Sequence, residues 1–123
     1  MTNSGPVRPL LWAPRTLESI RNFPKEVRTA LGRALYLAQT GGKHPSAKPL
    51  KGFGSAGVLE IVEDFDRNAY RAVYTVRFKD AVYVLHVFQK KSKRGIETPL
   101  ADIGLIKERL NWAEQCHTQK KNG

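Results

Sequence analysis

The chain has 123 residues, which is the size of one ordinary domain and enough to bury a core without disulfides or metal ions. Hydrophobic residues make up 41% and charged residues 26% of it, a composition typical of folded rather than disordered proteins. Lysine and arginine total 21 against 11 aspartates and glutamates, so the net charge is +10. This excess favours a polyanionic partner, namely nucleic acid, a membrane surface or an acidic protein.

Several classes of protein are excluded by what the sequence lacks. No apolar run is long enough to span a membrane, and the proline-containing N-terminus has no apolar signal core, so we expect a cytoplasmic protein. The one cysteine, Cys116, cannot form an internal disulfide or a multi-cysteine zinc site. The histidines lack ligand spacing, and no phosphate-binding glycine loop or GxSxG motif occurs. We therefore expect neither a metal nor a cofactor.

The first third of the chain predicts a short strand and two helices. Residues 1–9 are expected to form a flexible lead-in, and residues 10–12 are apolar and suit an edge strand. Thr16 can cap a short helix that extends through residue 22, and Pro24 suits the first position of a second helix. The apolar positions of this second helix recur at helical spacing and are Val27, Ala30, Leu31, Ala34, Leu35 and Ala38.

Glycines punctuate the region that follows. Gly41 and Gly42 end the second helix. Gly32 lies inside that helix, where glycine costs roughly 1 kcal/mol relative to alanine, and it can mark a close contact between helices. Residues 42–57 then form a loop rich in glycine, proline, lysine and serine.

Three strands are predicted next, over residues 58–63, 70–78 and 81–88. The second is rich in aromatic and β-branched residues, as strands are. Lys79 and Asp80 form a two-residue connection to the third strand, which predicts a tight hairpin. The third strand is apolar at both parities, as is typical of a central strand buried on both faces.

A basic loop over residues 90–95 leads into the last helix, which is expected to begin at Thr98–Pro99 and to end before a frayed tail, residues 117–123. The order of elements predicts one domain, residues 1–123, of the α+β class. Its sheet is twisted and mainly antiparallel, with helices packed on one face and a C-terminal helix. The apolar face of that last helix is formed by Leu100, Ile103, Ile106 (or Leu105) and Leu110.

Alternation of side chains along these strands gathers charge on one face of the sheet. On the second strand the apolar parity faces the core, so Arg71 and Arg77 project from the other face. Glu60 of the first strand shares that face, and His86 and Lys90 share a parity on the third strand and its exit. A sheet face that carries these residues and is rimmed by cations would form a cationic groove. Such a groove suits RNA, because cations neutralise phosphates with little sequence preference. The cations expected to rim it are Lys48, Lys51, Lys90, Lys91, Lys93 and Arg94.

Each of these residues also has a purely structural explanation. Arg71 can be a solvated strand residue or can pair with Glu60, and the basic run 90–94 is usually a solvated turn. His86, within an apolar strand, is more often a satisfied core histidine than a catalytic base. If the groove cuts RNA without a metal ion, the 2′-hydroxyl is the nucleophile, and an arginine or lysine must stabilise the charge added at phosphorus. The residues alone indicate a basic α+β domain that binds nucleic acid.

Four motifs in order carry a resemblance to a known family. They are KPLKGFG at 48–54, VLEI at 58–61, YRAVY at 70–74 and VLHVFQKK at 84–91, followed by the helix opened by Thr98–Pro99. This set resembles the RelE/HigB-type toxins of type II toxin–antitoxin systems, and in particular their phage-derived HigB-like branch. The resemblance covers roughly residues 10–113. It implies a small RelE-like fold.

The resemblance also implies an activity and partners. The activity is that of a ribosome-dependent, metal-independent mRNA endoribonuclease that inhibits translation, in which the 2′-hydroxyl attacks the adjacent phosphate and leaves a 2′,3′-cyclic phosphate. The partners are mRNA on the ribosome and a cognate antitoxin, usually a helix-turn-helix protein encoded by the adjacent gene. No membrane and no small-molecule cofactor are implied.

The resemblance assigns a role to each motif residue. Arg71 matches the family arginine that binds the scissile phosphate and stabilises the transition state, and Lys90 and Lys91 match a phosphate-holding pair. Glu60 matches a strand carboxylate that acts as a base or orients the arginine. His86 matches the histidine of the branch. The RNA-binding residues expected beside these catalytic candidates are Lys48, Lys51, Arg77, Lys93 and Arg94.

The chain also departs from the family pattern. Many members carry a catalytic histidine or tyrosine near the C-terminus, where this sequence offers only His117, so the general acid is unassigned. ParE proteins share the fold but act on DNA gyrase, and fold alone does not settle the target. The alternatives are therefore a ParE-like gyrase inhibitor and a non-catalytic, phage-derived nucleic-acid-binding protein. The lysine pair favours the RNA-cleaving branch.

Overall fold

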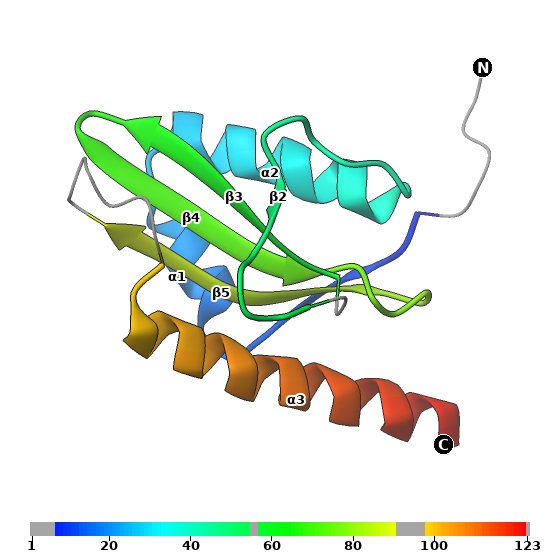
Figure 1. Ribbon diagram of the computed structural model, residues 1–123. Helices are drawn as coiled ribbons and strands as arrows, with labels where there is room; N and C mark the ends of the chain where they lie inside the picture. Colours follow the sequence, from blue (N-terminus) through cyan, green and yellow to red (C-terminus); the bar gives the residue numbers. More distant parts are fainter. Residues whose placement is uncertain (1–6, 55–56, 91–97, 123) are drawn as a thin grey trace.

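The computed structural model describes residues 7–54, 57–90 and 98–122, and Figure 1 shows its course. In these residues the strands form one sheet of five, in the order β1-β5-β4-β3-β2. The elements are β1 (Leu10–Trp12), α1 (Thr16–Arg21), α2 (Lys25–Gln39), β2 (Lys48–Pro49), β3 (Val58–Phe65), β4 (Asn68–Thr75), β5 (Val82–Lys90) and α3 (Leu100–Asn122).

The sheet is antiparallel from β2 to β5, and only β1, at the edge, pairs in parallel with its neighbour β5. The predicted α+β class, with an antiparallel-dominated sheet and a C-terminal helix, is confirmed, as is the edge strand at residues 10–12. No helix in the described ranges is both long and apolar enough to cross a membrane.

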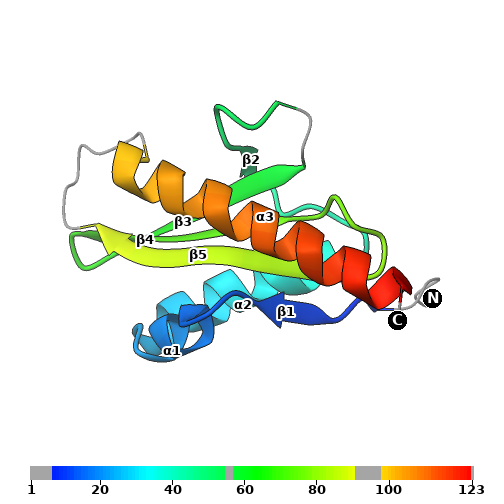
Figure 2. The same cartoon turned by 90° about the horizontal axis from the view of Figure 1, so that it is seen from below.

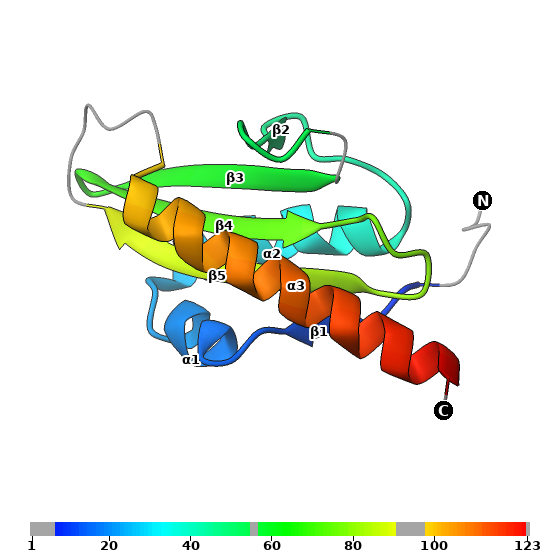
Figure 3. The ribbon, with the colours of Figure 1, turned by 60° about the horizontal axis from the view of Figure 1, so that its bottom comes forward.

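Helices cover both faces of the sheet. The helices α1 and α2 lie on one face and α3 runs obliquely across the other (Figures 2 and 3). The core under α1 and α2 includes Val27, Leu31, Leu35, Ile61 and Tyr74. The core under α3 includes Val73, Tyr83, Leu85, Ile106 and Ala113. This double cover explains why β5 is apolar at both parities.

The helix α2 buries the stripe predicted for it, apart from the half-buried Ala30. It gives way at Thr40 to Gly41, whose φ of 90° is a conformation that glycine adopts without strain. The predicted contact at Gly32 is wrong, because this residue is exposed and nothing in the described structure lies within 4 Å of the Cβ that it lacks. Pro24 precedes the helix rather than opening it.

Local contacts at the N-terminal end also differ from expectation. Thr16 does not cap α1: its hydroxyl donates to the Ala13 carbonyl at 2.7 Å, and Arg15, in a left-handed conformation, precedes the helix. The lead-in is not flexible as far as residue 9. The guanidinium of Arg8 donates to the carbonyls of Ala38 and Phe78, at 2.7 and 3.0 Å, which ties this residue to segments far along the chain.

The backbone conformation of the connecting residues, and not their polarity, determines which connections between β3, β4 and β5 are tight hairpins. The β3–β4 hairpin turns at Asp66 and Arg67, whose φ values of 51° and 69° are the left-handed conformations that a two-residue hairpin requires. The tight hairpin predicted at Lys79–Asp80 is wrong, because neither residue adopts a positive φ. Instead, β4 ends at Thr75 and the whole of residues 76–81 joins it to β5.

The helix α3 differs from its prediction at both ends. Leu100 is 87% exposed, because at about 100° per residue it lies well off the arc that buries Ile106 and Ala113. The predicted frayed tail is wrong through residue 122, which is helical. His117 holds this part of the helix against the protein, with Nδ1 3.0 Å from Asp80 Oδ1.

Candidate functional site

The register of the strands brings three candidate residues to the sheet face beneath α3. Glu60 of β3 lies opposite Val73 of β4, which in turn lies opposite His86 of β5. Arg71 is two residues from Val73 and therefore faces the same side. Local strand geometry thus places Arg71, Glu60 and His86 in one neighbourhood.

Arg71 is held in a buried ion pair. The residue is 2% exposed, and its Nη1 lies 3.3 Å from Oε2 of Glu60, whose side chain is 12% exposed. Charges of this kind leave water only when they are paired. Of the two structural alternatives for Arg71, pairing with Glu60 is the correct one, and the solvated strand residue is wrong.

The segment that leads into α3 completes the surroundings of the carboxylate. The hydroxyl of Thr98 donates to the same Oε2 atom of Glu60 at 2.8 Å. The helix itself begins two residues later, at Leu100. Glu60 therefore joins β4 to the start of α3 through two hydrogen bonds.

His86 is bound by the first turn of α3. Its Nε2 lies 2.8 Å from Oδ1 of Asp102. Its ring stacks on that of Phe88, with the ring centroids 4.6 Å apart and the planes inclined by 18°. The side chain is 12% exposed, so His86 is a largely buried histidine with a carboxylate partner.

A β-bulge aims His86 at α3. The β4–β5 register shifts between Val73, which pairs with His86, and Tyr74, which pairs with Val84, so that Leu85 is an extra residue on β5. The extra residue allows Leu85 and His86 to face the same side, as bulges near functional sites often do. The carbonyl of Leu85 accepts a hydrogen bond of 3.2 Å from Nη1 of Arg109, on α3.

Thr98 and Asp102 are site residues that the sequence analysis missed. An aspartate in the first turn of a helix is ordinarily explained by the helix dipole, and a threonine before a proline by capping. Neither explanation points to a partner on the sheet. The only available signal was their spacing of four residues, which places the two side chains on one side of the chain where it enters α3.

The basic rim is described in part. Lys48 of β2 lies opposite Glu60 in the register and is exposed, as is Lys51 in the following turn. Lys90 ends β5, where it is half-buried. Three further predicted rim residues, Lys91, Lys93 and Arg94, lie outside the described residues.

The structure separates Arg77 from this group. Arg77 lies beyond the end of β4, six residues along the chain from Arg71, and its Nη2 is 3.1 Å from Oε2 of Glu114 on the C-terminal half of α3. The sequence analysis placed Arg71 and Arg77 on one strand face. Arg77 still lies on the side of the sheet that α3 covers, since it pairs with Glu114, but six residues of extended chain at about 3.3 Å each place it roughly 20 Å from Arg71.

Comparison with known proteins identifies the family. Residues 18–111 match the family described as Phage derived protein Gp49-like (DUF891). The chain belongs to the Gp49-like family. This is a family of RelE/HigB-like toxins. Neither a curated protein nor a solved structure matches the chain.

The matched region of this Gp49-like protein contains the whole cluster around Arg71, from Glu60 to Asp102. Within residues 7–54, 57–90 and 98–122, no group of three or more histidine, cysteine, aspartate or glutamate side chains is arranged to hold a metal ion. The side chains that meet in this cluster are a guanidinium, two carboxylates, an imidazole and a hydroxyl.

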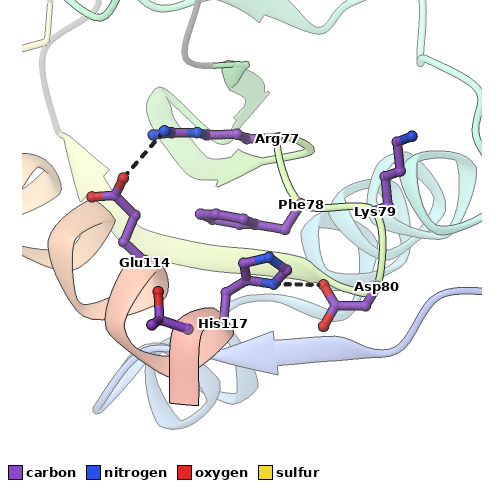
Figure 4. A pocket seen from close by; sticks show the side chains of 7 residues that line it. Arg77, Phe78, Lys79, Asp80, Glu114 and His117 are labelled. Atoms are coloured by element: carbon purple, nitrogen blue, oxygen red, sulfur yellow. Dashed lines mark hydrogen bonds and ion pairs between the residues drawn. The ribbon is translucent and has the colours of Figure 1, made fainter. Parts of the chain in front are cut away.

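A cavity of about 600 Å³ lies at the other end of α3 (Figure 4). Two polar pairs lie in its wall, Arg77 with Glu114 and His117 with Asp80. A second cavity lies beside it along α3, between Asn111 and Gln119. Arg71 lines neither cavity. The lining residues are Arg77, Phe78, Lys79, Asp80, Glu114, His117 and Thr118.

Proposed function

We propose that this Gp49-like protein is the toxin of a type II toxin–antitoxin system and acts as a ribosome-dependent, metal-independent mRNA endoribonuclease that inhibits translation. The observation that carries the proposal is the buried Arg71 guanidinium, held by Glu60 beside the His86–Asp102 pair. Membership of a RelE/HigB-like toxin family supports it. The net charge of +10 supports an RNA substrate.

The reaction is an internal transesterification. The RNA 2′-oxygen forms a bond to phosphorus, the bond from phosphorus to the 5′-oxygen breaks, and a 2′,3′-cyclic phosphate and a 5′-hydroxyl result. Arg71 stabilises the charge that builds on the phosphoryl oxygens. Lys90, at the end of β5, and Lys91, beyond it, bind phosphate on the same strand of RNA. No redox partner or metal ion is needed for the balance, because the 2′-hydroxyl gives up one proton and the leaving 5′-oxygen takes up one from solvent water.

The hydrogen bonds favour a division of roles between the carboxylates. Glu60 already accepts from Arg71 and Thr98, so we assign it to orienting the arginine. Asp102 is the acceptor for His86 Nε2, which leaves Nδ1 of the neutral ring as the basic nitrogen. We assign to His86 the removal of the 2′-hydroxyl proton, with Asp102 fixing the tautomer.

Burial of Arg71 adds a conformational step. A phosphate can reach a guanidinium that is 2% exposed only if neighbouring groups move. Thr98 and Asp102 hold Glu60 and His86 by hydrogen bonds. We propose that RNA binding replaces the contact between Thr98 and Glu60 and so gives phosphate access to Arg71.

The deciding experiment is expression in a bacterium without antitoxin, with mRNA 5′ ends mapped. We expect growth arrest and cuts in phase with codons, and we expect Arg71→Lys to abolish the cuts because lysine cannot reproduce the fork of the guanidinium. Arg67→Lys, at an exposed arginine of the β3–β4 turn, is the matched control and should cut normally.

The other outcomes count against the proposal. Arrest without mRNA cuts would point to gyrase or another protein target, and the absence of arrest would point to a non-catalytic nucleic-acid-binding protein. We also propose that a helix-turn-helix protein encoded by the adjacent gene is the antitoxin. Co-expression of that protein should restore growth.

A further inference from the structure

Gly32 has no explanation inside the described protein. It lies in the middle of α2, where no described atom other than the helix's own nearby backbone lies within 4 Å of the position that a Cβ would take, and its φ is not left-handed. Glycine at such a position weakens a helix by roughly 1 kcal/mol relative to alanine. Neither packing nor backbone conformation requires glycine here, so the position leaves a bare stretch of helix backbone, and what distinguishes it from other exposed glycines is the set of side chains around it.

The surface around Gly32 is cationic and carries an exposed aromatic ring. Arg28 lies one helical turn before Gly32 and Tyr36 one turn after it, on the same ridge. Tyr36 is 53% exposed, and Nε of Arg28 donates to the Phe23 carbonyl at 3.1 Å. The absent side chain leaves a notch between these two residues.

Two further cations flank the notch. Lys25 and Arg33 are exposed on the side of α2 that faces away from the core. Among the residues that the structure describes, none of Lys25, Arg28 and Arg33 forms an ion pair. We name the surface formed by Lys25, Arg28, Gly32, Arg33 and Tyr36 the cationic notch.

We propose that the cationic notch binds the phosphate backbone of a folded RNA, separate from the strand that is cut at Arg71. Unpaired lysines and arginines neutralise phosphates, a bare helix backbone allows close approach, and an exposed tyrosine can stack on a base or pack on a ribose. The choice of RNA rests on the proposed function, since a ribosome-dependent enzyme meets folded RNA on the surface of the ribosome.

A protein partner fits the notch less well. The cores of protein interfaces are apolar, whereas the large hydrophobic side chains exposed in the described structure are only Val7, Tyr36 and Leu100. Of these, only Tyr36 lies on α2. The notch therefore offers charge and close approach but little apolar area.

The notch is a second site and not an extension of the first. The helix α2 packs on one face of the sheet and α3 on the other (Figure 2). Arg71 lies on the α3 face, so the sheet and α2 itself separate it from the notch. The notch and Arg71 therefore face opposite sides of the sheet.

The test compares two glycines of the same kind. Gly32 in α2 and Gly104 in α3 are both exposed, and nothing described lies within 4 Å of the missing Cβ of either. Gly32→Gln and Gly104→Gln should each raise the thermal unfolding temperature. With purified ribosomes in a sedimentation assay, Gly32→Gln should weaken binding about tenfold, as expected for the loss of one close contact, and Gly104→Gln should leave it unchanged.

The salt dependence of ribosome binding tests whether the notch contacts phosphates. Arg33→Gln should lower the slope of log affinity against log salt by about one unit, the value expected for one lost phosphate contact. Equal ribosome binding by the two glycine variants would overturn the proposal. So would an unchanged salt slope, or a loss confined to binding of the antitoxin.

This assay measures binding without cleavage, so the two proposals can fail separately. If no mRNA is cut but ribosome binding still depends on Gly32, the notch stands and the nuclease fails. If mRNA is cut normally and binding is indifferent to Gly32, the notch fails and the nuclease stands.

Discussion

The Arg71–Glu60 pair makes a quantitative prediction about stability. Removing one partner of a buried ion pair leaves the other charge desolvated, which costs about 3–5 kcal/mol, and both side chains are largely buried here, at 2% and 12% exposure. Against a total stability of about 5–15 kcal/mol, Arg71→Met should lower the unfolding temperature by roughly 10–20 °C. Asp64→Asn, at an exposed acid on the same strand as Glu60, should shift it very little.

The double variant separates charge from packing. Replacing both members of a buried pair by apolar residues of similar size is often neutral or stabilising, so Arg71→Met with Glu60→Leu should fall within about 1 kcal/mol of the native protein. Urea unfolding followed by circular dichroism at pH 7 measures all four proteins. The reasoning is refuted if Arg71→Met alone costs less than about 1 kcal/mol or if the double variant is as unstable as the single one.

This result also sharpens the functional test. An inactive Arg71→Lys protein can be inactive because it is unfolded. The double variant at Arg71 and Glu60, if it is stable, removes the guanidinium from a folded protein. Loss of mRNA cutting in that variant is then a loss of chemistry and not of structure.

Three further predictions concern single side chains. Burial raises the pKa of Tyr74 from 10.0 to about 12, so the folded state holds this proton more tightly than the unfolded chain does. The free energy of unfolding should therefore fall by about 3 kcal/mol between pH 10 and pH 12. In urea unfolding at alkaline pH, Tyr74→Phe should abolish this part of the decline. Its buried hydroxyl has no hydrogen-bond partner among the described residues, so at pH 7 the variant should be at least as stable as the native protein. His117→Ala, which removes the exposed contact to Asp80, should cost under about 1 kcal/mol and speed hydrogen exchange in the last described turns of α3. Thr98→Val, which deletes a hydrogen bond to Glu60, should cost about 1 kcal/mol in urea unfolding.

Periodicity was sufficient to predict the parts of the fold that depend on local spacing. The stripe of α2 and the double burial of β5 follow from periods of 3.6 and 2, and the structure buries Val27, Leu31 and Val84 accordingly. The shared face of Arg71 and Glu60 follows from the same alternation. These features could be predicted because each depends only on neighbours within one element or one hairpin.

Contacts made by α3 could not be predicted in this way. Thr98 meets Glu60 across 38 residues of sequence and Asp102 meets His86 across 16. Both contacts depend on where α3 crosses the sheet and on the bulge at Leu85, and neither is encoded in a local period. The polar pair Lys79–Asp80 led to a wrong hairpin prediction for a related reason. The type of a turn depends on the φ angles of its residues, and polarity does not determine those angles.

Because Glu60 and His86 are both bound by residues at the start of α3, the site is assembled by packing and not by the strands alone. The strands supply Arg71, Glu60 and His86, and the helix supplies the two hydrogen bonds that hold the last two in place. Anchoring of α3 by Ile106 and Ala113 is therefore a condition for the geometry of the arginine. It follows that the sheet face beneath α3 responds to anything that shifts this helix, whereas the cationic notch of α2, on the opposite side of the sheet, does not.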